Sequence, residues 1–341
     1  MAELPKVIVA PHPRRMARIF RDEDLERLRG VADLVWCRDE AMPEEALYEA
    51  LPDAVALVHG AWPYGGEEVL ERAPRLRAVL EVLGGHSRPT FPYDGCFRRG
   101  IRVLSCSPAF APQVAEMALG LAIAASRGIA RGDRLFRTGQ EVYQMAGNEG
   151  NFLLYNKPVG LVGFGALGRA LLPLLAPFRV SASAYDPWLP DAVLREAGCT
   201  PRPLDELLGT SRVLFVLAAP TTENRGLLSR ERLALIPEGA VLVLISRAHL
   251  VDFDALTDLV LAGRIRAGID VFPEEPLPQD HPIRRAEGAV LSAHRAGSTQ
   301  EGHWEIGRMV VDDLEMILRG LPPRVMLRAE PELVPRTIVR R

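Results

Sequence analysis

The sequence has 341 residues, 48% of them hydrophobic and 25% charged, which is enough chain for two globular domains with buried cores. The formal net charge of -3 argues against a nucleic-acid partner, because such proteins usually carry a basic patch. The longest apolar run, residues 117–125, is about half as long as a membrane span, so we expect no membrane partner. The N-terminus lacks the apolar core of a secretion signal, and we expect a cytoplasmic location.

Short apolar runs alternate with helical patterns over the first hundred residues. The predicted strands are 6–10, 34–37, 54–59, 79–83 and 102–105, and the predicted helices are 22–29 and 43–51. This alternation predicts a small α/β domain with a parallel sheet.

Residues 113–129 predict a helix that is apolar on most faces, as expected of a helix buried between domains. The segment that follows, 131–157, is polar and predicted to be irregular. It is either an arm that covers another surface, such as a second subunit, or a surface loop.

A glycine motif follows the apolar run that begins at residue 159. Gly163, Gly165 and Gly168 have the spacing G-x-G-x-x-G, and a helical segment comes directly after them. In a dinucleotide-binding unit these glycines permit a tight turn, the approach of a pyrophosphate and close packing of helix on strand. An ordinary glycine-rich turn between strand and helix is the alternative.

The residues around this motif favour dinucleotide binding. The amides of Ala166 and Leu167 would face the phosphates from the helix N-terminus. Asp186 ends the next apolar run at the distance expected of the acid that binds the adenosine ribose. Its negative charge favours NAD over NADP, because it repels a 2′-phosphate.

The chain after residue 186 continues to alternate between strands and helices. The predicted strands are 213–217, 240–245, 266–270 and 289–291, and the predicted helices are 192–197, 229–235 and 252–262, with 204–208 between them. Such a pattern indicates a doubly wound sheet, whose ligands lie beyond the carboxyl ends of the strands. A final helix, 299–319, is long enough to return to the first domain. We therefore expect a discontinuous domain of residues 1–112 and 298–341 around a nucleotide-binding domain of residues 113–297.

Three residues that follow predicted strands form a chemically coherent set. Arg247 can hold a carboxylate through two parallel hydrogen bonds. His294 can exchange a proton with a hydroxyl or carbonyl oxygen, and Glu275 can orient its ring and favour the protonated form. Each residue alone has an ordinary structural explanation. Together with a nicotinamide cofactor, they predict hydride transfer between a 2-hydroxy acid and a 2-oxo acid.

Three segments around these residues resemble the signature blocks of the D-isomer-specific 2-hydroxyacid dehydrogenases. They are SRAHLVDFDAL from residue 246, AGIDVFPEEPLP from residue 267 and VLSAHRAGST from residue 290. The glycine motif and the helix PQVAEMALGLAIAASRGI fall where this family has them. The resemblance implies two Rossmann-like α/β domains with doubly wound parallel sheets, an NAD cofactor, a small 2-hydroxy or 2-oxo acid as substrate, and a homodimer.

The resemblance also implies roles for individual residues. Arg247 binds the substrate, His294 is the acid/base and Glu275, directly before Pro276, is its partner. The expected cofactor-binding residues are those of the glycine motif and of the strand ends: Gly163, Gly165, Ala166, Leu167, Gly168, Asp186, Ala219, Pro220, Ser246, Asp270, His294 and Gly297. Asp270 corresponds to the position that contacts the nicotinamide carboxamide.

The first domain departs from the family. Its usual G-x-G-x-D-N substrate loop is Gly85-His86-Ser87-Arg88-Pro89-Thr90 here, and Phe110 replaces a common asparagine. We expect Gly85, His86 and Ser87 to contact the substrate, with Arg247 and His294. His249 replaces a small or aliphatic residue and either lines the pocket or lies at the surface.

The sequence leaves other functions open. A formate dehydrogenase of this superfamily would carry glutamine in place of Glu275, whereas phosphite oxidation needs a direct assay. An NAD(H)-sensing protein like the corepressors of this fold would keep the same three residues. Metal binding is not expected, because the histidines and cysteines lack the spacing of a metal site.

Overall fold

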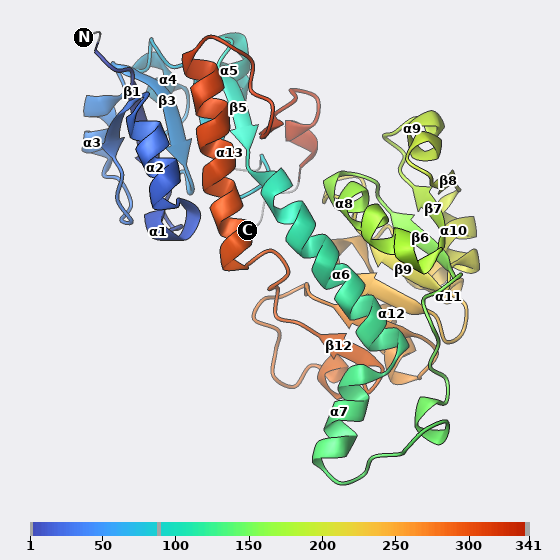
Figure 1. The fold of residues 1–341 in the computed structure, drawn as a ribbon. Helices are drawn as coiled ribbons and strands as arrows, with labels where there is room; N and C mark the ends of the chain where they lie inside the picture. Colours follow the sequence, from blue (N-terminus) through green and yellow to red (C-terminus); the bar gives the residue numbers. More distant parts are fainter. Residues whose placement is uncertain (1–2, 87–89, 338–341) are drawn as a thin grey trace. The chain divides into compact units, whose positions relative to one another are not determined.

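The computed structural model describes residues 3–86 and 90–337 (Figure 1). The chain forms two compact units, one of residues 1–110 and 298–341 and the other of residues 111–297. The first unit is therefore discontinuous, since the end of the chain completes it.

The first unit contains a six-stranded sheet in the order β13-β5-β4-β3-β1-β2. Five of the strands are parallel, and the sixth pairs antiparallel with β5. The bounds are β1 (Lys6–Ala10), β2 (Asp33–Trp36), β3 (Ala54–His59), β4 (Ala78–Glu81), β5 (Arg102–Ser105) and β13 (Leu327–Arg328). The prediction of a parallel sheet was right for the first five strands and missed β13, whose two residues are too short for a periodic pattern.

Helices cover both faces of this sheet because successive side chains of a strand point to opposite sides. Val7 and Val9 pack with α1 (Met16–Ile19), α2 (Asp22–Arg29) and α13 (Gln300–Leu318). Ile8 and Ala10 pack on the opposite side with α3 (Glu44–Ala50), α4 (Glu67–Glu71) and α5 (Tyr93–Arg98). Figure 1 shows α13, in red, beside α1 and α2, although 270 positions separate Gln300 from Gly30 in the sequence.

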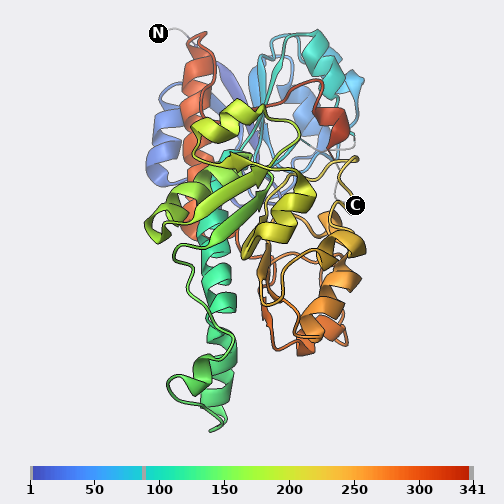
Figure 2. The ribbon, with the colours of Figure 1, turned by 90° about the vertical axis from the view of Figure 1, so that its right-hand side faces the viewer.

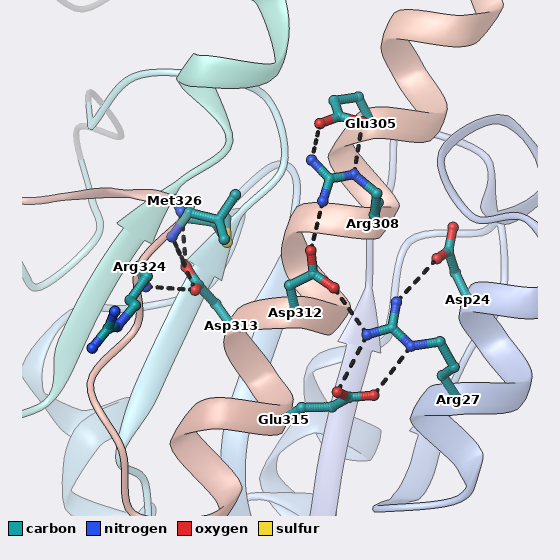
Figure 3. Close-up of polar contacts among 10 residues, drawn as sticks. Asp24, Arg27, Glu305, Arg308, Asp312, Asp313, Glu315, Arg324 and Met326 are labelled. Atoms are coloured by element: carbon teal, nitrogen blue, oxygen red, sulfur yellow. Dashed lines mark hydrogen bonds and ion pairs between the residues drawn. The ribbon is translucent and has the colours of Figure 1, made fainter.

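Polar contacts fix α13 in this unit (Figure 3). Arg27 of α2 pairs with Asp312 at 2.9 Å and with Glu315 at 3.2 Å. The neighbouring Asp313 is fully buried and accepts hydrogen bonds from three successive amides, at 2.7 Å from Arg324 and 2.8 Å from Met326 at its two ends. The helix thereby holds the segment that leads into β13.

The second unit contains a seven-stranded sheet in the order β12-β11-β10-β9-β6-β7-β8, and all of its strands are parallel. The bounds are β6 (Pro158–Val162), β7 (Ser181–Tyr185), β8 (Thr200–Pro201), β9 (Val213–Val216), β10 (Val241–Leu244), β11 (Arg266–Ile269) and β12 (Ala289–Leu291). The strand order reverses between β6 and β9. A doubly wound sheet binds its ligands at such a reversal, outside the carboxyl ends of the strands.

Helices flank this sheet as well. Buried residues of β9 and β10 pack with α10 (Leu204–Thr210), α11 (Arg230–Ala234) and α12 (Phe253–Leu261). The helix α6 (Ala111–Ser126) contacts α8 (Ala166–Leu175), β10 and β11. The short α9 (Asp191–Glu196) precedes β8.

The helical segment 107–126, which comprises η1 (Ser107–Phe110) and α6, is long and apolar enough to span a membrane. The longest uninterrupted apolar run in the sequence, residues 117–125, is shorter than this helical segment. Half of the segment is buried inside the protein, which is typical of a core helix.

The segment predicted to be irregular, 131–157, is helical over its first part. The helix α7 (Ile129–Arg137) is followed by a turn of 3-10 helix at Ala146–Asn148. An ion pair between Asp133 and Arg137, one helical turn apart, supports α7. The helix was not predicted because its glycine and polar residues conceal the helical pattern in the sequence. Gly128, with a φ of 63°, separates α7 from α6. Figures 1 and 2 show α7 extending beyond the end of α6, away from the central strands of this unit.

Candidate active site

The glycine motif forms the turn between β6 and α8, at the reversal of strand order. Gly163 has a φ of 94°, and a Cβ atom there would lie 2.5 Å from the Cα atom of Ala218, after β9. A Cβ atom on Gly168 would lie 3.0 Å from the Phe164 ring and 3.2 Å from the carbonyl oxygen of Gly163. Both positions therefore require glycine for close packing.

Gly165 differs from the other two glycines because it faces open space. It is exposed, and a Cβ atom added to it would meet nothing within 4 Å. Ala166 is exposed and Leu167 half-buried in the first turn of α8. The backbone of this turn can therefore be approached by a pyrophosphate, which the N-terminal amides of a helix favour.

Asp186 lies directly after β7 and beside the glycine turn. One carboxylate oxygen accepts a hydrogen bond from the Phe164 amide at 2.8 Å, and the other accepts from the Trp188 amide at 3.0 Å. Each oxygen keeps a further lone pair. The carboxylate is thus fixed at a position that suits a ribose diol.

Three buried hydroxyls follow the strands on the other side of the reversal. Thr221, Ser246 and Ser292 lie after β9, β10 and β12, and their oxygens have no hydrogen-bond partner among the described residues. Buried polar groups are nearly always paired. These hydroxyls fit the polar groups of a nicotinamide cofactor.

The other predicted cofactor residues of these loops lie at or near the surface. Ala219 is exposed, while Pro220 and Gly297 are half-buried. The carbonyl oxygen of Ala219 accepts a hydrogen bond from Nδ2 of the Asn224 side chain at 2.7 Å, which fixes the loop after β9.

His294 and Glu275 are in direct contact. The two carboxylate oxygens of Glu275 lie 2.6 and 2.8 Å from Nδ1 of His294. The Phe272 amide donates to the same carboxylate at 3.1 Å, which fixes the glutamate. The carboxylate therefore makes Nδ1 the protonated nitrogen and orients the ring. Glu275, rather than the adjacent Glu274, is the residue in contact with the histidine.

Asp270, at the end of β11, holds the loop that carries the histidine. Its carbonyl oxygen accepts from the His294 amide at 2.7 Å, and its carboxylate accepts from the amides of Arg295 and Ala296 at 2.9 and 3.1 Å. His294 has a positive φ of 51°. Two hydrogen bonds to the buried carboxylate of Asp270 and one to its carbonyl oxygen thus hold a turn that most residues disfavour.

Arg247 follows β10, the strand next to β11. Its guanidinium donates to the carbonyl oxygen of Ser246 at 2.7 Å, and the side chain is half-buried. The sheet thus places Arg247, Glu275 and His294 after three neighbouring strands. Glu275 and His294 are in direct hydrogen-bond contact. The half-buried His249 lies nearby, and burial together with the positive charges of Arg225 and Arg247 lowers its pKa.

In the first unit, the predicted substrate loop follows β4. Gly85 has a φ of 73°, and its amide donates to the Ser107 hydroxyl at 2.7 Å, so this amide is already paired. His86 contacts Glu81. Ser87, with Arg88 and Pro89, lies outside the described residues. The Phe110 ring would lie 2.9 Å from a Cβ atom on Gly84, which explains a glycine there.

Sequence reasoning missed several polar residues of these loops. Glu81 and Tyr93, which contact each other and His86, were not singled out, and neither was Thr221. For Glu81 a signal existed, since an acid inside an apolar strand is unusual. Among the described residues, no group of three or more histidine, cysteine or acidic side chains could hold a metal.

Comparisons with known proteins agree with one another. The family model described as "D-isomer specific 2-hydroxyacid dehydrogenase, NAD binding domain" matches residues 119–296. A glyoxylate reductase of Pyrococcus furiosus is 31% identical over 301 residues, which cover 87% of this chain and 89% of that protein. A D-3-phosphoglycerate dehydrogenase of Methanocaldococcus jannaschii is 28% identical over 282 residues, 82% of this chain. The alignment covers 52% of that dehydrogenase, so this chain spans about half of its length.

A solved structure resembles the whole chain. The crystal structure of a phosphoglycerate oxidoreductase from Rhizobium etli has a TM-score of 0.86 and 40% sequence identity. The superposition covers 96% of this chain and 98% of that one. The likeness extends to both α/β units.

Proposed function

We propose that this chain, which belongs to the D-isomer-specific 2-hydroxyacid dehydrogenases, transfers a hydride between a nicotinamide cofactor and C2 of a D-2-hydroxy acid or its 2-oxo partner. The observation that carries the proposal is the contact of 2.6 Å between His294 and Glu275 in the loops after β12 and β11. Arg247 follows the next strand of the same sheet.

In this proposal, NADH supplies the hydride to C2 when it is bound. Arg247 holds the substrate carboxylate with two parallel hydrogen bonds. His294 gives the proton on Nε2 to the C2 oxygen, and in the reverse direction it takes that proton back. Because Nδ1 faces Glu275, the exchanged proton is the one on Nε2. Asp270 keeps the histidine loop in place.

We further propose that NAD is preferred over NADP. The carboxylate of Asp186 is fixed by two backbone amides beside the glycine turn. A ribose hydroxyl can donate to it, whereas a 2′-phosphate would be repelled.

The test of this function is a pair of substitutions. We expect His294→Ala to lower kcat for NADH oxidation by about 100-fold or more across a panel of 2-oxo acids, since the proton donor is lost. We expect Arg247→Ala to raise KM strongly for the same substrates. NADH binding, followed by its fluorescence, should persist in both variants.

The control is Arg195→Ala, which removes an exposed arginine paired within α9. It should leave the activity unchanged. Full activity in both site variants would contradict the proposed mechanism.

The alternative functions have less support. The relatives are named as reductases and dehydrogenases, which favours an enzyme over an NAD(H)-sensing corepressor. Glu275 stands where formate dehydrogenases carry glutamine. No observation favours phosphite over a 2-oxo acid.

We also propose that the chain acts as a homodimer through the arm formed by residues 131–157. The arm exposes several large apolar side chains, with exposed fractions of 62% for Phe136, 69% for Tyr143 and 86% for Met145. Exposed apolar groups so close together in the sequence are typical of a surface that binds a protein.

A further inference from the structure

A buried carboxylate and imidazole are paired in the first unit, at the end of β4. Glu81 is 0% exposed, and its Oε2 lies 2.7 Å from Nδ1 of His86. The Tyr93 hydroxyl donates to the other oxygen of Glu81 at 2.8 Å. We propose that this trio recognises an oxygen-bearing substituent on the 2-oxo acid, an inference that rests on the proposed function.

The hydrogen bonds of the trio decide which atom can meet a ligand. A carboxylate only accepts, so Nδ1 of His86 carries a proton and donates it. Tyr93 occupies the second carboxylate oxygen. Nε2 is then the one ring nitrogen of His86 left for another partner. It accepts a hydrogen bond when the ring is neutral and donates one when the ring is protonated, and a hydroxyl group satisfies either state.

This nitrogen is buried and has no hydrogen-bond partner among the described residues. The side chain of His86 is only 9% exposed. An unpaired buried nitrogen costs stability. A network that served stability alone would gain by completing this last bond, whereas a recognition group must leave it for the ligand.

The trio lies at the edge where this sheet would bind a ligand. β4 is flanked by the parallel strands β3 and β5, so the residues after all three meet at one edge. The order β2-β1-β3-β4-β5 reverses between β1 and β3, as it does in doubly wound sheets that bind ligands at their carboxyl edge. The turn after β4 contains Gly84 and Gly85, both with positive φ, and His86 follows it.

Aromatic side chains support the trio. The Tyr93 ring lies edge-on to His86 and packs against Phe91, with ring centroids 4.7 Å apart in the second pair. Phe91 in turn contacts Trp62 and stacks on His59, which ends β3. A recognition group held in this way is preorganised, and a hydrogen bond formed away from water discriminates strongly between substrates.

The experiment compares two substrates of equal size. One is 3-hydroxy-2-oxopropanoate, and the other is 2-oxobutanoate, in which a methyl group replaces the hydroxyl. We expect the kcat/KM of the wild-type protein to favour the hydroxyl substrate by about 100-fold or more. The ratio of the two kcat/KM values is the quantity compared between variants.

Four variants test the assignment. His86→Leu should reduce the ratio at least tenfold, mainly through KM of the hydroxyl substrate, and His86→Gln should recover part of it because its amide can still bond to a hydroxyl. Tyr93→Phe should reduce the ratio less, since it frees Glu81 and loosens the histidine. Tyr48→Phe is the matched control, because it removes a tyrosine hydroxyl bonded to the surface residue Glu44. It should keep the wild-type ratio.

The outcomes separate this inference from the function on which it rests. If the wild-type protein reduces no 2-oxo acid, the proposed function fails and the inference fails with it. If it reduces both substrates equally well, or if His86→Leu keeps the wild-type ratio, only the inference is overturned. If His86→Leu fails to fold, which the absence of a thermal unfolding transition would show, the test passes to Tyr93→Phe. An unchanged ratio of the two kcat/KM values in Tyr93→Phe then overturns the inference.

Discussion

The lowered pKa of His249, which follows β10, predicts that the protein loses stability in acid. Burial, followed by the positive charges of Arg225 and Arg247, lowers its pKa below the ordinary value of 6.5. The unfolded chain therefore binds a proton at a higher pH than the folded chain does. His249 therefore costs no stability above pH 6.5, where its ring is neutral in both states. The free energy of unfolding falls as the pH drops from 6.5 toward the lowered pKa.

We predict that His249→Gln weakens this dependence. Unfolding midpoints in urea, measured at several pH values from 8 down to about 5, should fall less steeply for the variant than for the wild-type protein. The two proteins should differ in how steeply the unfolding midpoint falls with pH, and not in the effect of pH near 8, where His249 is neutral in both states. Parallel curves would show that His249 has the same pKa in the folded and unfolded chains.

At the residue level, the sequence predicted what lies directly after strands and failed on what only packing reveals. Glu275 could be chosen over Glu274 from its place before Pro276, and it is the residue that contacts His294. The partnership of Glu81 and Tyr93 could not be predicted. Twelve positions separate them, and only the packing of α5 beside the end of β4 brings them together.

At the level of elements, α13 holds the final segment of the first unit through one buried carboxylate. Asp313 is 0% exposed and accepts hydrogen bonds from the amides of Arg324, Val325 and Met326. We predict that Asp313→Ala lowers the free energy of unfolding by about 2–4 kcal/mol, because one buried amide and two partly buried amides lose their acceptor. Urea unfolding followed by circular dichroism would measure this loss.

The adjacent Asp312 provides a matched control. Its side chain is 24% exposed and pairs with Arg27 and Arg308 at the surface (Figure 3). Asp312→Ala should cost less than about 1 kcal/mol, as exposed ion pairs usually do. Equal losses for the two variants would contradict the role assigned to Asp313.

The strand and helix pattern was predictable where apolar periodicity was strong. The strands Lys6–Ala10, Ala54–His59, Arg102–Ser105 and Ala289–Leu291 have the predicted bounds. The two-residue strands β8 and β13 lack enough residues for a pattern. α7 was missed because four successive residues of the helix, 131–134, are charged or glycine and interrupt the apolar pattern.

At the level of the whole molecule, the apolar surface of the arm predicts the oligomeric state. We expect the wild-type protein to be a dimer in analytical ultracentrifugation. Replacing both Tyr143 and Met145 by serine should shift it toward the monomer, because the burial of these apolar side chains between subunits would no longer stabilise the dimer. Leu235→Ser, which changes a side chain that is 45% exposed outside the arm, is the control. A monomeric wild-type protein, or a double variant as dimeric as the wild type, would contradict this prediction.

The discontinuity of the first unit constrains the order in which the protein matures on the ribosome. Val310 and Leu314 of α13 complete the core on one face of the sheet that begins with β1, and both are fully buried. The face formed by Val7, Val9 and Val58 is therefore covered only in part, by α1 and α2, until α13 has been synthesised. The second unit is continuous and emerges earlier, so it can fold first. The part of the first unit that is translated before the second unit is thus the last to complete its core, because that core requires α13.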